Sequence, residues 1–79
     1  MFRTVTVDHR DPTPLHEQLA TVLRDRIASG DITDKLPSEG YLQQQYGVSR
    51  GTVRHAIDTL VAEGRVYKIA ARGTFVTRR

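Results

Sequence analysis

Apolar residues recur with a helical period in two stretches of this sequence. In the stretch that ends at Gly64, the apolar positions follow i, i+3, i+4, i+7 and i+8 spacing, which places them on one face of an α-helix. They are Val53, Ala56, Ile57, Leu60 and Val61. An earlier stripe consists of Leu15, Leu19, Val22, Leu23 and Ile27. The pattern predicts two amphipathic helices that share a core.

A shorter helix is predicted between these two by the signals at its ends. Ser38 is a favourable N-cap, because its side-chain oxygen accepts a hydrogen bond from a free amide of the first turn. The helix is expected to run from Glu39 to Tyr46, and Gly47 follows where a helix end favours a left-handed residue. Ser49 is expected to cap the next helix. Two helices joined by a tight turn that contains Gly form a helix-turn-helix, which can lay its second helix in the major groove of DNA.

The beginning of the chain carries weaker signals. Residues 2–7 alternate modestly, as a strand does, and residues 1–12 are expected to form an N-terminal arm or strand. Thr13 is predicted to cap the first helix, with Pro14 at the first helical position, where its missing N–H costs nothing. This helix is expected to occupy residues 13–30.

After Gly64 the apolar period changes from 3.6 to about 2, which is typical of strands. Candidate strands at residues 65–69 and 74–77 flank a short tip at residues 70–73 that contains Gly. A hairpin behind a helix-turn-helix is a wing, expected over residues 65–77. The predicted fold is therefore mainly α with a small β-hairpin: a winged helix-turn-helix of three helices plus the wing.

The whole chain, residues 1–79, is expected to form one domain, since 79 residues are near the lower limit for an independent core. Its helix-turn-helix would occupy residues 38–64. Tyr67 and Phe75 are predicted to pack the wing onto the core.

Composition removes several classes of function. The chain has no cysteine, so it has no disulfide, thiolate metal site or cysteine nucleophile. His9, His16 and His55 lack the spacing of zinc ligands, and no Gly-rich phosphate loop is present. No apolar run is long enough for a membrane span or a secretory signal. We therefore expect no enzyme activity, metal or cofactor, and a cytoplasmic protein.

Positive charge is concentrated in the second half of the chain. Residues 1–37 hold five Lys/Arg against six Asp/Glu, whereas residues 38–79 hold seven against three. The basic excess therefore lies on the helix-turn-helix and the wing, as a nucleic-acid surface requires.

Residues compatible with DNA gather in the first turns of the third helix, away from its apolar stripe. Arg50 and Arg54 lie one turn apart, so one could fork onto a guanine while the other contacts a phosphate. Arg72 at the hairpin tip could reach the backbone or minor groove, and Lys68 a phosphate. The predicted DNA contacts are Ser38, Ser49, Arg50, Gly51, Thr52, Arg54, His55, Lys68, Arg72 and Gly73. The structural alternatives are helix capping for the hydroxyl residues and plain solvent exposure for the charged ones.

Four blocks of sequence, LPSE, GVSRGTVRHAIDTL, AEG and RGTFV, occur in an order and spacing that resembles the DNA-binding domain of the GntR family of bacterial transcription regulators. The opening PTPLHEQLATVLRDRIASG is similar to the first helix of that family, especially in the HutC-like and YtrA-like branches. The resemblance implies a repressor that binds a palindromic operator as a dimer. Its implied contacts match Ser49, Arg50, Gly51, Thr52 and Arg54 at the start of the third helix, and Arg72 and Gly73 at the wing tip.

The chain departs from the family pattern at four places. Gly40 stands where many members carry Arg, Gly51 replaces a usual polar residue, Ala71 stands where a wing-tip Gly is usual, and the connector at residues 31–35 lacks a Pro-Gly pair. Members of the family also resemble this domain followed by a ligand-binding or aminotransferase-like domain. We therefore expect an isolated DNA-binding part rather than an autonomous small regulator. A small-molecule effector is expected only with such a further domain.

The main alternative is a winged helix that binds a protein or RNA, because this fold serves several functions. The basic first turn of the third helix argues against this alternative without excluding it.

Overall fold

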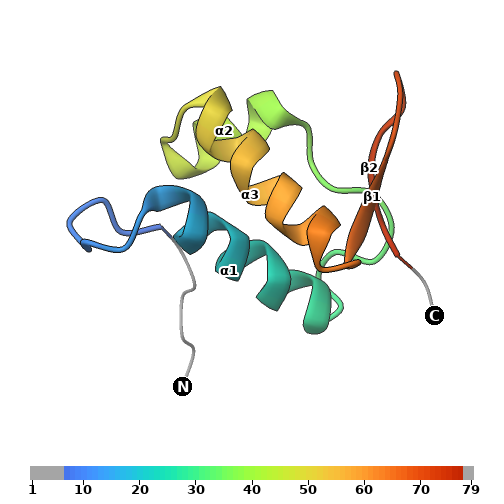
Figure 1. Cartoon of the computed structure of the whole chain (residues 1–79), viewed down its shortest axis with the longest axis horizontal. Helices are drawn as coiled ribbons and strands as arrows, with labels where there is room; N and C mark the ends of the chain where they lie inside the picture. Colours follow the sequence, from blue (N-terminus) through green and yellow to red (C-terminus); the bar gives the residue numbers. More distant parts are fainter. Residues whose placement is uncertain (1–6, 78–79) are drawn as a thin grey trace.

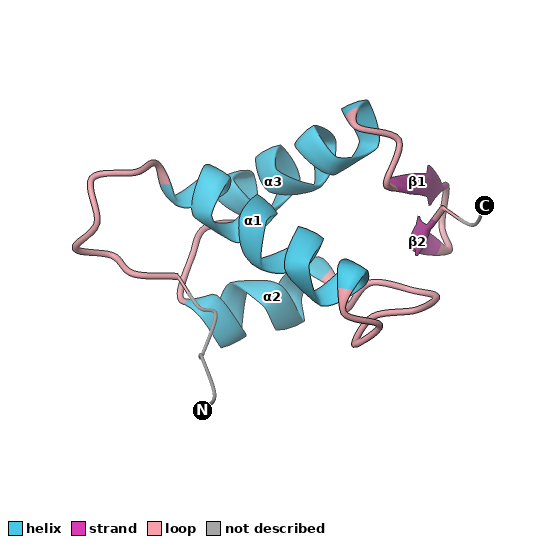
Figure 2. Ribbon diagram, turned by 90° about the horizontal axis from the view of Figure 1, so that it is seen from below, coloured by secondary structure: helices cyan, strands magenta, loops and turns pink. Residues whose placement is uncertain are grey.

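Three helices pack around one apolar core, and a β-hairpin follows the third helix (Figure 1). The structure is a computed structural model that describes residues 7–77. Its elements, in chain order, are α1 (Leu15–Ala28), α2 (Glu39–Tyr46), α3 (Arg50–Ala62), β1 (Val66–Ile69) and β2 (Gly73–Val76). Figure 2 shows the hairpin beside the helical bundle, at the end where α3 stops. The predicted winged helix-turn-helix is confirmed, while the strand signal of residues 2–6 lies outside the described residues.

The core is built by the apolar stripes of α1 and α3, with α2 contributing Leu42 and Tyr46. Four of the five predicted stripe residues of α3 are buried, but Val61 is 39% exposed. The prediction for Val61 is wrong because this residue lies about 100° around the helix from Leu60, at the border of the stripe.

The start of α1 also differs from the prediction. Pro14, not Thr13, is the N-cap: it has an extended ψ of 140°, and its carbonyl accepts hydrogen bonds from the amides of Glu17 and Gln18. The Thr13 amide instead donates to Asp11 Oδ1 at 2.8 Å, which closes a turn before the helix and lowers the pKa of Asp11. Because Thr13 is part of this turn, α1 begins one residue later than the preference of proline for the first helical position predicts.

The start of α2 and the turn between α2 and α3 have the caps that the sequence predicts. Ser38 Oγ accepts a hydrogen bond from the Tyr41 amide, and Ser49 Oγ accepts one from the Thr52 amide. Gly47 between the helices has a left-handed conformation with φ 65° and ψ 42°. The start of α2 and the turn between α2 and α3 are therefore defined by three residues whose chemistry is visible in the sequence.

The hairpin is antiparallel, and β2 has partners on both sides. Val66 pairs with Val76 and Ile69 with Gly73. On the other side, the Val76 amide donates to Asp34 O at 2.6 Å and the Leu36 amide to Thr74 O at 2.9 Å. Residues 34–36, which lead into α2, therefore fasten the wing to the helical part of the domain.

Tyr67 and Phe75 do not pack the wing onto the core, contrary to prediction. Val66 is buried and Val76 packs against the core. Because side chains alternate along a strand, Tyr67 and Phe75 then face away from it. Their rings stack at a centroid distance of 5.9 Å, and Tyr67 is 46% exposed. The period of the strand was predicted correctly, but its phase relative to the core was not.

The turn between the strands holds Ala71 in a left-handed conformation, with φ 63°, and the Arg72 amide donates to Ile69 O at 3.0 Å. We expect Ala71→Gly to stabilise the domain by about 0.5–1 kcal/mol, because a left-handed L-residue costs about 1–2 kcal/mol and the flexibility of glycine when unfolded offsets part of that. Urea unfolding measures the change. Ala70→Gly is the matched control and should not stabilise, since Ala70 has no positive φ.

Candidate nucleic-acid interface

The first turns of α3 present an exposed surface outside the helical core. Arg50, Gly51, Arg54 and His55 are exposed there. Thr52 is half-buried, and its hydroxyl accepts a hydrogen bond from Ser49 Oγ at 2.9 Å. The two hydroxyl residues therefore first stabilise the helix start, which was the structural alternative for them.

Arg54 is paired with Glu39 at the start of α2. Its Nε lies 3.3 Å from one carboxylate oxygen and 3.4 Å from the other. The Arg54 side chain is 58% exposed. A pair this exposed contributes little free energy, so it does not prevent the guanidinium from contacting DNA. Because Glu39 takes the Nε side, the two terminal nitrogens remain available for a base edge.

His55 packs against α1. Its ring stacks on that of His16 at a centroid distance of 3.6 Å, with an angle of 11° between the planes. Ring nitrogens of parallel stacked imidazoles do not converge on one point, so the pair has no metal-ligand geometry. The described part of the chain also contains no group of three or more residues that could hold a metal ion.

A groove of about 330 Å³ separates the start of α2 from the wing tip. Lys35, Ser38, Arg72 and Gly73 are among the residues that line it. Gly73 has φ 124°, and a Cβ at this position would lie 2.7 Å from Lys35 Cε. The absence of a side chain at Gly73 thus lets Lys35 cross the wing beside Arg72.

Three basic residues have no ion-pair partner within residues 7–77: Arg50 at the start of α3, and Lys35 and Arg72 along this groove. By contrast, Lys68 Nζ lies 2.9 Å from Oδ1 of Asp58, a residue of α3. Lys35 is not among the contacts predicted from the sequence. Its signal was weak, since a lone Lys in a polar connector resembles any solvated charge.

The sequence profile of the bacterial regulatory proteins of the gntR family matches residues 15–76. The chain belongs to the GntR family. The predicted resemblance is therefore confirmed.

Relatives in this family are transcription regulators rather than enzymes. The transcriptional repressor NagR of Bacillus subtilis is 37% identical over 76 residues, which are 94% of this chain and 31% of that protein. The mannosyl-D-glycerate system repressor MngR of Escherichia coli is 43% identical over 65 residues, 80% of this chain and 27% of that protein. The chain thus spans less than a third of the length of either relative.

Solved GntR structures have the same fold. The DNA-binding domain of AraR in complex with operator ORX1 superposes with a TM-score of 0.84 at 35% identity, covering 96% of this chain and all of that one. YtrA from Sulfolobus acidocaldarius, a GntR-family transcription factor, gives 0.83 at 31% identity, covering 95% of this chain and 81% of that one. The chain thus belongs to the GntR family and has the fold of GntR DNA-binding domains.

The structure shows the surroundings of three residues that depart from the GntR pattern, Gly40, Gly51 and Ala71. Neither Gly40 nor Gly51 is required by packing, since a Cβ at Gly40 would meet nothing within 4 Å and one at Gly51 only Ser49 Oγ at 3.9 Å. Ala71 stands at the left-handed turn position, where glycine has no steric cost.

None of the helices formed by residues 7–77 combines the length and apolar character that a bilayer crossing requires.

Proposed function

We propose that this chain directs a transcription repressor to a specific duplex DNA operator by inserting the start of α3 into the major groove. The supporting observation is that three basic residues lack ion-pair partners within residues 7–77. Arg50 lies at the exposed start of α3, and Lys35 and Arg72 line the groove between the start of α2 and the wing tip. In this arrangement Arg50 and Arg54 supply the base and phosphate contacts of the recognition helix. Ser49, Gly51, Thr52 and His55 flank them along the same turns.

The remaining contacts would fix the position of the domain on the duplex. Free amides at the start of α2, behind Ser38, can hold a phosphate, helped by the positive end of the helix dipole. Arg72 and Gly73 at the wing tip would follow the neighbouring backbone, with Lys35 beside them. Lys68 would contact a phosphate as well, because its pair with Asp58 is exposed, like that of Arg54 with Glu39, and holds it only weakly.

A single domain of this size reads few base pairs, so we propose that two copies bind a palindromic operator with two-fold symmetry. The isolated domain would then dimerise weakly in solution and mainly on DNA. A small-molecule effector would act only if a further domain is present. The protein would work in the bacterial cytoplasm, associated with the nucleoid when bound.

Selection from random duplex pools, followed by mobility shifts at increasing salt, tests this function. We expect enrichment of one palindrome and an affinity that falls steeply with salt, because phosphate contacts release counterions. If no sequence is enriched, the proposal is wrong. Binding to single-stranded RNA or to protein in preference to any duplex would favour the alternative winged-helix function instead.

The contribution of Lys35 can be tested separately. We expect Lys35→Ala to weaken binding by a similar factor on the operator and on unrelated duplexes, and to reduce the salt slope by about 1, as for one lost phosphate contact. Lys35→Arg keeps the charge and should retain the slope. A change in base preference without a change in slope would contradict the assigned role.

A further inference from the structure

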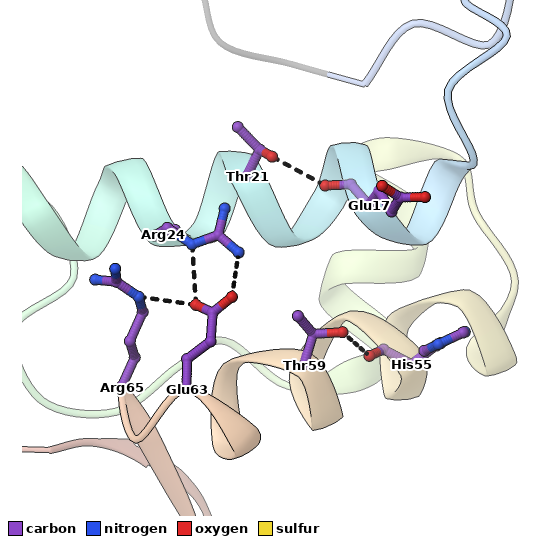
Figure 3. Close-up of polar contacts among 7 residues, drawn as sticks. All are labelled: Glu17, Thr21, Arg24, His55, Thr59, Glu63 and Arg65. Atoms are coloured by element: carbon purple, nitrogen blue, oxygen red, sulfur yellow. Dashed lines mark hydrogen bonds and ion pairs between the residues drawn. The ribbon is translucent and has the colours of Figure 1, made fainter.

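A single carboxylate joins α1, α3 and the wing (Figure 3). Glu63 is the C-cap of α3. It accepts hydrogen bonds from Arg24 Nε at 3.0 Å and Arg24 Nη2 at 2.7 Å, and its Oε1 accepts a third from Arg65 Nε at 2.8 Å. Arg24 lies on α1, and Arg65 directly precedes β1. We call Arg24, Glu63 and Arg65 the Glu63 clamp.

The clamp lies at the root of the hairpin. The backbone of Arg65 donates to Leu60 O at 3.0 Å and accepts from the Thr77 amide at 2.9 Å. The backbone of Arg65 therefore joins the end of α3 to the residue that follows β2, at the root of both strands. Together with residues 34–36, Arg65 therefore helps to fix the direction in which the wing leaves the bundle.

Helix stability alone does not account for Glu63. A negative charge at a helix C-terminus opposes the helix dipole. The two arginines compensate for this and lower the pKa of Glu63, with Arg24 the larger contributor, so the carboxylate stays ionised at neutral pH. Glu63 in turn raises the pKa of Arg24. The charge of Glu63 is therefore unfavourable for α3, but its hydrogen bonds connect α1, α3 and the wing.

We infer that Glu63 is a positioning residue for DNA binding, which holds the wing at the angle to α3 that lets the wing tip and the start of α3 contact one duplex together. A strand rises about 3.3 Å per residue, so the tip of a four-residue strand lies about 13 Å from its root. A tilt of about 15° at the root would move Arg72 by about 3 Å, enough to break a phosphate contact. This inference rests on the proposed function.

A double-mutant cycle on the selected operator tests the inference. We expect Glu63→Gln to weaken operator binding about threefold to tenfold, a moderate loss because residues 34–36 also hold β2. In an Arg72→Ala background the same substitution should cause little further loss, since the wing contact is already absent. In an Arg50→Ala background it should keep its full effect. A change in global stability alone would give equal losses in both backgrounds.

Arg24→Gln is the second variant, because it removes the α1 arm of the clamp and leaves Arg65 in place. It should reproduce a smaller version of the same pattern, and amide exchange should quicken at Thr77 and the wing but not at the start of α3. Circular dichroism establishes that each variant is folded at the assay temperature. If both variants are folded and bind like the unaltered protein, the inference is wrong while the proposed function stands. If the unaltered protein selects no duplex, the proposed function itself fails.

Discussion

Arg54→Ala is expected to weaken binding to the selected operator by about 1–3 kcal/mol and to relax the base preference at one position of each half-site. Two effects contribute. The variant loses the guanidinium whose terminal nitrogens are free to fork onto a base, and it leaves the Glu39 carboxylate unpaired at the DNA surface, where it repels phosphate. Mobility shifts with the operator and with single-base-pair variants measure both quantities.

Arg54→Lys is the matched control, because it keeps the charge near Glu39 but cannot form a planar fork. We expect the lysine variant to recover part of the affinity and little of the base preference. If Arg54→Ala binds operator variants with unchanged preference, Arg54 contacts phosphate rather than a base. If its operator affinity is also unchanged, Arg54 does not contact DNA.

Leu60→Ala is expected to lower the free energy of unfolding by about 2–5 kcal/mol, the range for a leucine whose removal leaves a cavity in a packed core. Leu60 is 0% exposed and lies near the end of α3, and its carbonyl accepts the Arg65 amide at the wing root. In a domain near the lower size limit, this loss is a large fraction of the total stability. Urea unfolding gives the free energy, and operator binding at increasing temperature gives the functional consequence.

Val61→Ala is the control for this prediction, since Val61 is adjacent in sequence but exposed. We expect a change within about 0.5 kcal/mol, as for most surface substitutions. Equal losses at the two positions would mean that Val61 is buried in solution, for example against a second copy of the domain.

Local signals account for what the sequence predicts well. The caps at Ser38 and Ser49 and the left-handed Gly47 involve residues within a few positions of one another, so their chemistry is visible without the fold. The start of α1 escapes prediction because the turn closed by Asp11 competes with a proline signal that is equally local. Two short-range preferences conflict there, and the sequence does not rank them.

Contacts between elements are not predictable in the same way. Arg54 meets Glu39 and Lys68 meets Asp58 across 15 and 10 positions, only after the elements have packed. The outward phase of Tyr67 follows from which face of β1 meets α3, and alternation alone fits either face. Lys35 becomes part of the candidate interface only because residues 34–36 pair with β2. Arg72 was predicted as a DNA contact, whereas the groove that it lines together with Lys35 depends on tertiary structure.

The pairing of residues 34–36 with β2 also has a consequence for behaviour in concentrated solution. An unpaired strand edge is a template for edge-to-edge association and aggregation. Here β2 is covered on both sides, and the segment beyond it is short and followed at once by Pro37, which cannot donate a backbone hydrogen bond. The outer edge of β1 is four residues long and carries the charged Lys68 in its interior. This small sheet therefore has little exposed strand edge with which another chain could pair.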